Sequence, residues 1–306
     1  MSQDKTSPRH FDYDRHDEEW EKCLSDPDRK KIAQTWLNQH DTFDRWRHSR
    51  MYKLLLPLIK GYENENWLTV GDGRFGTDAN ALIAMGVREV HCSDISDKLL
   101  KIGAREGFIN DYSAQNAESL TFNDGSFDFV LCKEAYHHFP RPHVALHEMF
   151  RVCQKAVVLI EPRDHYIDKG ALQWIFDGLL KLIKSTSFNT YSFESIGNFV
   201  FSLSERECEK FLLGMNKRFV AFNEMNDIYE PGVEFIAIND TDKTQRLRVT
   251  KLKFKLMLMD IFAKLGFFKP RLVFAILFKT QPDEITIKNL LRHGWRVKEL
   301  PLNPYA

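Results

Sequence analysis

Residues 67–94 read WLTVGDGRFGTDANALIAMGVREVHCSD, and this stretch decides the fold. It begins with a short apolar run at 67–70, which is typical of a buried parallel strand. A glycine-containing turn follows, and then a stretch at 77–85 has apolar residues at helical spacing. A second strand, expected at 88–92, leads to Asp94. The sequence therefore predicts a strand, a glycine loop, a helix, a second strand and an acid within one unit.

The glycines and the acid of this unit suit the binding of a nucleoside. Gly71, Gly73 and Gly76 form a G-x-G-x-x-G turn, in which glycine lets the backbone bend sharply and approach a ligand. Asp94 follows about 20 residues later, where a carboxylate accepts hydrogen bonds from two ribose hydroxyls. The pattern does not say which nucleoside, because nicotinamide-binding folds share it. The glycines also fit a tight strand–helix turn without any ligand.

The composition indicates a globular chain without a charge bias. Its 306 residues, 43% hydrophobic and 28% charged, suffice for one α/β domain with additions. Lys+Arg and Asp+Glu both number 43, so the net charge gives no reason to expect a nucleic-acid partner. The five cysteines are scattered, and the first residues are polar. We therefore expect reduced cysteines, no secretory signal, no stable membrane insertion and a cytoplasmic protein.

Helices are predicted ahead of the first strand. Asp26 followed by Pro27 is a favourable helix start. An apolar stripe predicts a helix over 44–60, which Pro57 interrupts. Aromatic residues are dense in this region: Trp20, Trp36, Phe43 and Trp46. We interpret residues 1–60 as a helical cap that could close over a ligand.

The segment 115–139 reads QNAESLTFNDGSFDFVLCKEAYHHF. Its start Asn116-Ala117-Glu118, the run 124–128 and a strand ending at Cys132 resemble the D-A-E-x-L-P-F-x-D-x-S-F-D run of class I S-adenosylmethionine-dependent methyltransferases. The branch that it resembles contains ubiquinone-type and other small-molecule methyltransferases. The resemblance covers about a third of the chain, from 67 to 162. It includes a helix expected at 142–152 and a fifth strand at 156–161.

The resemblance implies a Rossmann-like, doubly wound α/β fold with a seven-stranded, mostly parallel sheet. Residues 61–165 would form the core that binds S-adenosylmethionine, and residues 166–306 would form a helical insertion or lid with the last strands. Asn116 stands where the family has an acid, and its side-chain oxygen can still bind the adenine amino group. The implied cofactor-binding residues are Gly71, Asp72, Gly73, Gly76, Asp94, Ile95, Asn116, Ala117 and Lys133.

Two departures from the family concern the methionine end of the cofactor. The family usually has an acid two residues before the first glycine, where this chain has Thr69. The third glycine also comes one residue later than in the family. Asp72, inside the loop, is then the carboxylate expected to meet the methionine ammonium group.

The candidate catalytic residues follow the fourth strand. Methyl transfer requires a nucleophile held in line with the methyl group, and a general base only if that nucleophile carries a proton at neutral pH. Glu134, His137 and His138 are the candidate bases, although the histidines could instead orient the loop. Asp164 and His165, after the fifth strand, are candidates for substrate contact. No compact cluster of ligand residues occurs in the sequence, so we expect no metal.

The C-terminal half predicts helices at 168–184 and 247–265 and strands at 218–222, 271–279 and 295–300. In the family the last two strands form an antiparallel hairpin, which a long insertion separates here. The two helices are apolar with interspersed lysines. They could serve a hydrophobic substrate, a membrane surface, a homodimer interface or core packing.

Three functions are compatible with the sequence. The first is a methyltransferase that acts on a small molecule, preferably on an oxygen of a sugar or secondary metabolite, and releases S-adenosylhomocysteine. The second is a methyltransferase-like binding or assembly module, which Thr69 and the shifted glycine suggest. The third is a nicotinamide-dependent oxidoreductase. The N-P-P-Y sequence of methyltransferases that act on DNA or glutamine is absent after the fourth strand, where the chain reads Cys132-Lys133-Glu134-Ala135.

Overall fold

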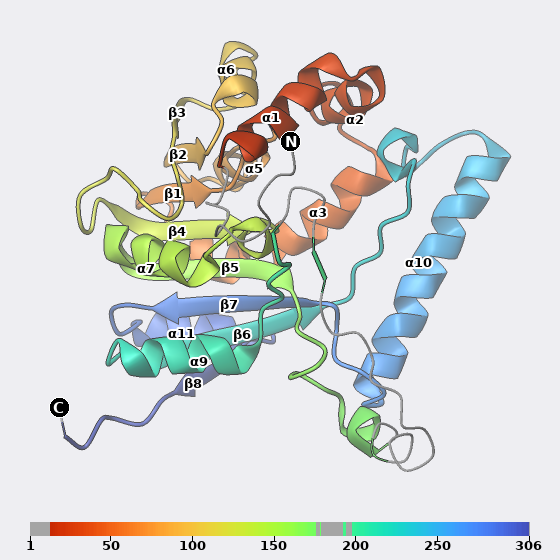
Figure 1. Ribbon diagram of the computed structural model, residues 1–306. Helices are drawn as coiled ribbons and strands as arrows, with labels where there is room; N and C mark the ends of the chain where they lie inside the picture. The colour runs from red at the N-terminus through yellow and green to blue at the C-terminus, as the bar shows by residue number, and fades with distance from the viewer. Residues whose placement is uncertain (1–12, 176–177, 179–191, 194–197, 306) are drawn as a thin grey trace, which may run out of the picture.

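The computed structural model describes residues 13–175, 178, 192–193 and 198–305. Its strands are β1 (Asn66–Val70), β2 (Glu89–Asp94), β3 (Asp111–Ala114), β4 (Phe127–Lys133), β5 (Cys153–Pro162), β6 (Phe219–Met225), β7 (Leu272–Phe278) and β8 (Arg296–Glu299). They form one sheet in the order β3-β2-β1-β4-β5-β7-β6-β8 (Figure 1). The pairs from β3 to β5 are parallel, whereas β7, β6 and β8 are paired antiparallel.

The labelled α-helices are α1 (Tyr13–Ser25), α2 (Pro27–Asn38), α3 (Phe43–Lys53), α4 (Leu56–Ile59), α5 (Thr77–Ala84), α6 (Lys98–Arg105), α7 (Pro142–Val152), α9 (Glu205–Gly214), α10 (Lys243–Lys264) and α11 (Glu284–Arg292). Two short 3-10 helices are η1 (Tyr136–His138) and η2 (Val233–Phe235). Local signals explain several boundaries. Asp26 caps α2 by accepting from the N–H groups of Asp28 and Arg29. Ser204 and Glu207 form a capping box at α9.

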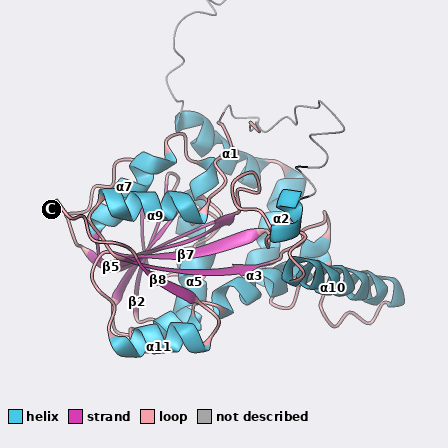
Figure 2. Cartoon of the chain, turned by 90° about the horizontal axis from the view of Figure 1, so that it is seen from below, coloured by secondary structure: helices cyan, strands magenta, loops and turns pink. Residues whose placement is uncertain are grey.

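Helices cover both faces of the sheet, and each face has its own hydrophobic core (Figure 2). On one face α7 and α9 pack through residues such as Met149, Phe150 and Leu212. On the other face α3, α4, α5 and α11 contribute Met51, Leu82 and Leu290 among others. Because both faces of the sheet are covered, the strands at its centre are apolar on both sides.

The predicted fold class is confirmed, with corrections of detail. The sheet has eight strands rather than seven, because β8 extends it beyond β6. The third strand, β3, lies at Asp111–Ala114. The helix expected over 44–60 is divided into α3 and α4, and Pro57 lies in the first turn of α4. The helix predicted at 168–184 is helical at 171–175, and residues 176–177 and 179–184 lie outside the described part.

The N-terminal helices pack over the glycine loop and beside the long helix α10. Ala33 and Trp36 of α2 form a cluster with Phe75 and Leu99, against which α1 also packs. Phe43 of α3 joins a second cluster with η2 and α10. All five cysteines are free thiols. No helix among the described residues is both long and apolar enough to cross a bilayer.

Candidate functional site

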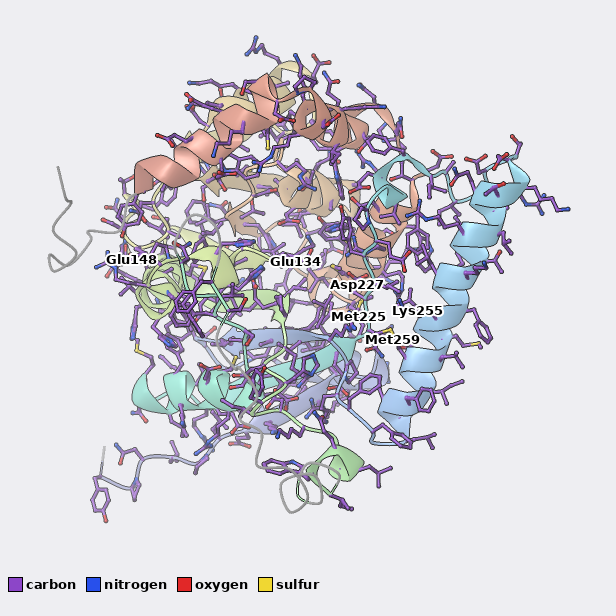
Figure 3. The ribbon with its side chains drawn as sticks, turned by 45° about the vertical axis from the view of Figure 1, so that its right-hand side comes forward. Glu134, Glu148, Met225, Asp227, Lys255 and Met259 are labelled. Atoms are coloured by element: carbon purple, nitrogen blue, oxygen red, sulfur yellow. The ribbon has the colours of Figure 1, made fainter. Side chains whose placement is uncertain are left out.

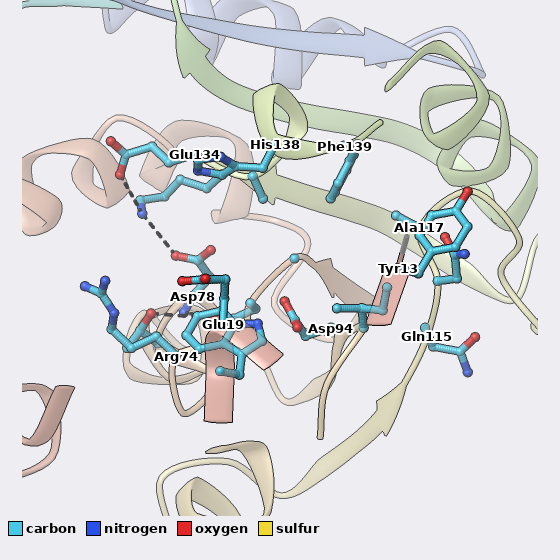
Figure 4. A pocket seen from close by; sticks show the side chains of 18 of the residues that line it. Tyr13, Glu19, Arg74, Asp78, Asp94, Gln115, Ala117, Glu134, His138 and Phe139 are labelled. Atoms are coloured by element: carbon cyan, nitrogen blue, oxygen red, sulfur yellow. Dashed lines mark hydrogen bonds and ion pairs between the residues drawn. The ribbon is translucent and has the colours of Figure 1, made fainter. Parts of the chain in front are cut away.

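A cavity of about 430 Å³ lies at the carboxyl ends of β1, β2 and β4 (Figure 4). In parallel α/β sheets this is the edge where ligands bind. Helices α1, α2 and α3 complete its wall with Trp20, Trp36 and His48. Nine of the residues selected from sequence line it: Gly71, Asp72, Asp94, Ile95, Asn116, Ala117, Lys133, Glu134 and His138. Gly73, Gly76 and His137 are not among the lining residues.

The glycine loop is shaped by close backbone contacts. Gly71 has a φ of 78°, and a Cβ there would lie 2.4 Å from the Cβ of Ala135, so only glycine fits. Gly76 has a φ of 73°, and a Cβ there would meet Ile109 and Cys92. Gly76 therefore allows α5 to pack closely behind the loop, and this packing role explains why it does not line the cavity.

Asp72 holds the loop to the start of α5. One carboxylate oxygen accepts from the N–H of Asp78 at 2.9 Å, and the other accepts from the N–H of Ala79 at 2.8 Å. The hydroxyl of Thr69 donates to the second oxygen at 3.0 Å. Burial and the nearby Asp78 raise the pKa of Asp72 to about 8. The Asp72 carboxylate, which we expected to meet an ammonium group, thus already accepts hydrogen bonds from the first turn of α5 and from the Thr69 hydroxyl.

Asp94, at the end of β2, faces the cavity beside the loop. Its carboxylate accepts from the N–H of Ser96 at 3.0 Å. A Cβ built on Gly73 would lie 2.7 Å from the Asp94 carboxyl carbon. The missing side chain at Gly73 therefore lets the loop backbone approach this carboxylate closely. Burial raises the pKa of Asp94 to about 6, although hydrogen bonds from Ser96, the Trp20 side chain and Gly73 favour the ionised form.

The side chain of Trp20, on α1, fills the space above Gly73. A Cβ on Gly73 would lie 2.4 Å from an indole carbon of Trp20. The same side chain hydrogen-bonds to Asp94. Trp20 was noticed in the sequence as part of an aromatic-rich cap, but nothing in its local pattern indicated that it would contact Asp94.

Polar contacts close the cavity near Asn116. The side-chain oxygen of Asn116 accepts from the N–H of Glu118 at 2.9 Å and so forms a local turn. Glu118 is buried and accepts from the Arg141 guanidinium at 2.6 Å and from the Tyr13 hydroxyl at 2.7 Å. This cluster ties the start of α1 to the loop before α7. Ala117 lies between these groups and lines the cavity.

Buried charges form the opposite end of the cavity. The ammonium group of Lys133 lies 3.3 Å from an Asp78 oxygen and 3.2 Å from a Glu134 oxygen. The Tyr52 hydroxyl also donates to Asp78. His48 Nδ1 lies 3.5 Å from the same Glu134 oxygen. Glu134 has a φ of 50°, a left-handed conformation that non-glycine residues rarely adopt.

These contacts shift the pKa values of the charged groups. Burial alone would raise the pKa of Glu134, but Lys133, His48 and Arg47 together lower it to about 2. Burial would lower the pKa of Lys133, but Asp78, Tyr52 and Glu134 raise it well above its ordinary value. Burial and Lys133 lower the pKa of His48, so His48 is neutral at pH 7. Lys133 and Glu134 therefore both remain charged.

Helix α3 is fixed in place by a separate ion pair. The Arg47 guanidinium contacts Asp44 at 2.5 Å and also pairs with Asp227, just after β6 (Figure 3). Because Arg47 is buried, its loss would leave carboxylates unpaired. This pair holds the helix that presents His48 to the cavity and the Tyr52 hydroxyl to Asp78.

Arg74, in the glycine loop, lines the same end of the cavity. Its guanidinium lies 5.8 Å from the ring centre of Trp36. Among the described residues no carboxylate forms an ion pair with Arg74. Arg74 and Asp78 were not selected from sequence. The sequence feature that could have identified them is their position, since Arg74 lies within the G-x-G-x-x-G turn and Asp78 just after it.

The histidines after β4 have different surroundings. His137 Nδ1 lies 2.6 Å from an oxygen of Glu161, a fully buried residue of β5. The other Glu161 oxygen accepts from the N–H groups of Ala135 and Tyr136. His138 lines the cavity, and its ring centre is 3.9 Å from that of His137. Asp164 and His165 are not among the lining residues, and Asp164 instead accepts from the N–H of Tyr166 at 2.8 Å.

No group of three or more acidic, histidine or cysteine side chains suited to a metal ion occurs among the residues placed in the structure. The absence of a metal requirement remains a prediction from sequence.

Comparisons with known proteins match the part of the chain that contributes most of the residues lining this cavity. Residues 68–160 match the family model of a methyltransferase domain. A search of the curated proteins finds no match. Similar solved structures include a Bacillus subtilis protein with 20% identity, covering 77% of this chain and 99% of that chain with a TM-score of 0.45. Another is magnesium protoporphyrin IX methyltransferase from Synechocystis with bound SAH, at 15% identity, 57% and 75% coverage and a TM-score of 0.40. A third is a SAM-dependent methyltransferase from Archaeoglobus fulgidus, at 15% identity, 74% and 94% coverage and a TM-score of 0.42.

Proposed function

We propose that this chain, whose residues 68–160 match the model of a methyltransferase domain, is a class I S-adenosylmethionine-dependent methyltransferase that transfers the cofactor's methyl group to a small molecule in the cavity described above. The observation that carries the proposal is the Asp94 carboxylate, which is buried at the end of β2 and lines the cavity beside the glycine loop. A carboxylate in this place can accept hydrogen bonds from the two adjacent hydroxyls of a ribose.

At the adenosine end, Asp94 would accept hydrogen bonds from the ribose hydroxyls. The Ala117 N–H and the Asn116 amide would bind the adenine edge. Asn116 already accepts from Glu118, so its remaining lone pair and its NH₂ group are the groups offered to the base. Trp20 occupies the space above Gly73, so binding of the ribose would require this indole to move.

At the other end, charge of both signs suits an amino acid. Arg74 and Lys133 offer positive charge to a carboxylate, while Asp78 and Glu134 offer negative charge to an ammonium group. In this proposal Asp72 builds the loop rather than binding the ammonium directly, because helix N–H groups occupy both its oxygens.

When bound, S-adenosylmethionine supplies a methyl group activated by a positively charged sulfur. The residues of this chain would hold the acceptor in line and exclude water with the cap helices. For a hydroxyl acceptor, His138 would take the proton, and His137 held by Glu161 would position the His138 ring. The preference for an oxygen acceptor rests on this pair of histidines.

Isothermal titration with S-adenosylmethionine, S-adenosylhomocysteine and NAD tests the proposal. We expect micromolar binding of the first two and no binding of NAD. Binding of NAD alone would favour the oxidoreductase, and binding of none would favour an assembly module. Gly73→Val should abolish binding of both sulfur ligands, because its side chain would collide with Trp20 and Asp94 and displace the carboxylate. Gly214→Val is the matched control, since Gly214, the last residue of α9, has no positive φ and no neighbour within 4 Å of its Cβ position.

A further inference from the structure

Helix α10 presents apolar side chains on two opposite faces. Val249, Leu252 and Leu256 are buried against α3 and η2. A second set of apolar side chains is exposed: Leu247, Phe254, Leu258, Ile261 and, just after the end of the helix, Leu265. At about 100° per residue, the exposed set forms one stripe on the side opposite the buried set. Phe254 is 56% exposed and Ile261 45%, so nothing in the described part of the chain covers the stripe.

Basic residues flank this stripe on both sides. The helix contains seven Lys or Arg residues and one acid, Asp260, although the whole chain has no net charge. Lys251 and Lys255 lie along one edge of the stripe, and Lys253 and Lys264 along the other. Lys255 also pairs with Glu230 at 3.5 Å, and Lys253 lies over the ring of Trp46. Asp260 accepts a hydrogen bond from Asn226 and faces the body of the protein. Among the described residues no carboxylate pairs with Lys251 or Lys264.

The apolar stripe continues past the end of α10. The N–H of Leu172 donates to the carbonyl of Gly266 at 2.9 Å, which joins the start of the 171–175 helix to the turn after α10. Trp174 and Ile175 of that helix are 59% and 58% exposed. Figure 1 shows α10 projecting from one side of the molecule, with this short green helix beside its lower end. Figure 3 shows Met259 on the side of α10 that faces the body.

We propose that the outer face of α10, together with Trp174 and Ile175, docks on an anionic lipid bilayer. An apolar stripe bordered by lysines is the pattern of helices that lie in the plane of a membrane interface, with apolar residues among the acyl chains and cations at the headgroups. A tryptophan at the tip suits the same interface. The positive charge of α10 favours an anionic bilayer over a second copy of the chain, because pairing two α10 stripes would bring their lysines together and they would repel each other.

Vesicle co-sedimentation of the full chain without cofactor tests the proposal, so its result does not depend on methyltransferase activity. We expect binding to phosphatidylcholine vesicles containing about 30% phosphatidylserine, weak binding to pure phosphatidylcholine, and release in about 0.5 M NaCl. Lys251→Glu combined with Lys264→Glu should weaken binding at least about tenfold. Phe254→Ser, Leu258→Ser, Ile261→Ser and Leu265→Ser together should do the same.

The matched controls lie on α11, away from this surface. Ile285 and Leu291 are exposed apolar residues there, and Lys288 is an exposed cation. Ile285→Ser with Leu291→Ser, and separately Lys288→Glu, should leave vesicle binding within about twofold of the wild type, because neither touches the proposed surface. Unchanged thermal unfolding of all variants establishes that they are folded.

Two results would overturn the proposal. One is equal binding of wild type and Lys251→Glu/Lys264→Glu protein to anionic vesicles. The other is light-scattering evidence of a dimer that the four serine substitutions convert to a monomer, which would make the stripe a contact between copies of this chain.

Discussion

At one end of the cavity, Asp94 and the Asn116–Ala117 segment offer hydrogen-bonding groups, and the Trp20 indole contacts Asp94. At the other end, Lys133 of β4 forms a buried ion pair with Asp78 of α5 and a second pair with the partly exposed Glu134. The first end can change its contacts when a ligand arrives. The second end cannot lose a partner without leaving a charge buried, which is strongly unfavourable. We infer from this difference that the charged end is built into the fold, whereas the end proposed to bind adenosine is completed by the ligand.

Replacing Lys133 should show the largest effect, and it should act on stability. Lys133→Met removes the cation between Asp78 and Glu134, so we expect a loss of about 3–5 kcal/mol in the free energy of unfolding. Urea denaturation measures this quantity. Lys155→Met is the control, because Lys155 pairs with Glu65 on a partly exposed surface and should cost at most about 1 kcal/mol. Equal stability of the two variants would mean that the charged end is not a structural unit.

Replacing Asp94 should act on ligand binding instead. Asp94→Ala should weaken S-adenosylhomocysteine binding by about 1.5–3 kcal/mol, the scale of hydrogen bonds to a charged group. Isothermal titration gives the dissociation constant. Asp97→Ala is the control, because Asp97 lies in the same turn but pairs with Lys101 at the surface. An unchanged constant in folded Asp94→Ala protein would remove Asp94 from the site.

The acidity of Asp94 predicts a pH dependence for the same binding. Its pKa is raised to about 6 by burial, and the ionised carboxylate is the form that accepts from ribose hydroxyls. The affinity for S-adenosylhomocysteine should therefore approach its maximum as the pH rises above 6. It should fall by up to about tenfold per pH unit below pH 6. Asp94→Asn should flatten this profile, and a wild-type affinity that is constant from pH 7 to 5 would contradict the assignment.

The smallest effect is expected at Trp20. Trp20→Ala empties the space above Gly73, so S-adenosylhomocysteine should bind about three- to tenfold more tightly, which corresponds to roughly one hydrogen bond. Trp174→Ala, on the outer surface, should leave the constant unchanged. If Trp20→Ala weakened binding, the indole would be a contact of the bound ligand rather than an obstacle to it.

Much of the fold followed from local patterns in the sequence. The predicted helix at 142–152 coincides with α7 because proline starts it and its apolar residues have helical spacing. The strands around Gly71 and Asp94 were found because parallel strands are apolar on both faces. The eighth strand was expected as a strand but not as part of this sheet, since the resemblance implied seven.

The site was less accessible to prediction where it depends on tertiary contacts. Trp20 lies 53 positions before Gly73 in the chain, and no local pattern links them. Asp72 was expected to face a ligand, but the start of α5 provides two N–H groups that it satisfies first. The exposed stripe of α10 was visible as an apolar helix with lysines, but only packing shows which of its two apolar faces is buried.

A crystal structure with S-adenosylhomocysteine tests most directly whether the cavity binds the adenosine of the cofactor. We expect both ribose hydroxyls within hydrogen-bonding distance of the Asp94 carboxylate, the adenine beside Ala117, and the Trp20 indole displaced from Gly73. Electron density for the ligand elsewhere, with Trp20 still over Gly73, would contradict the account.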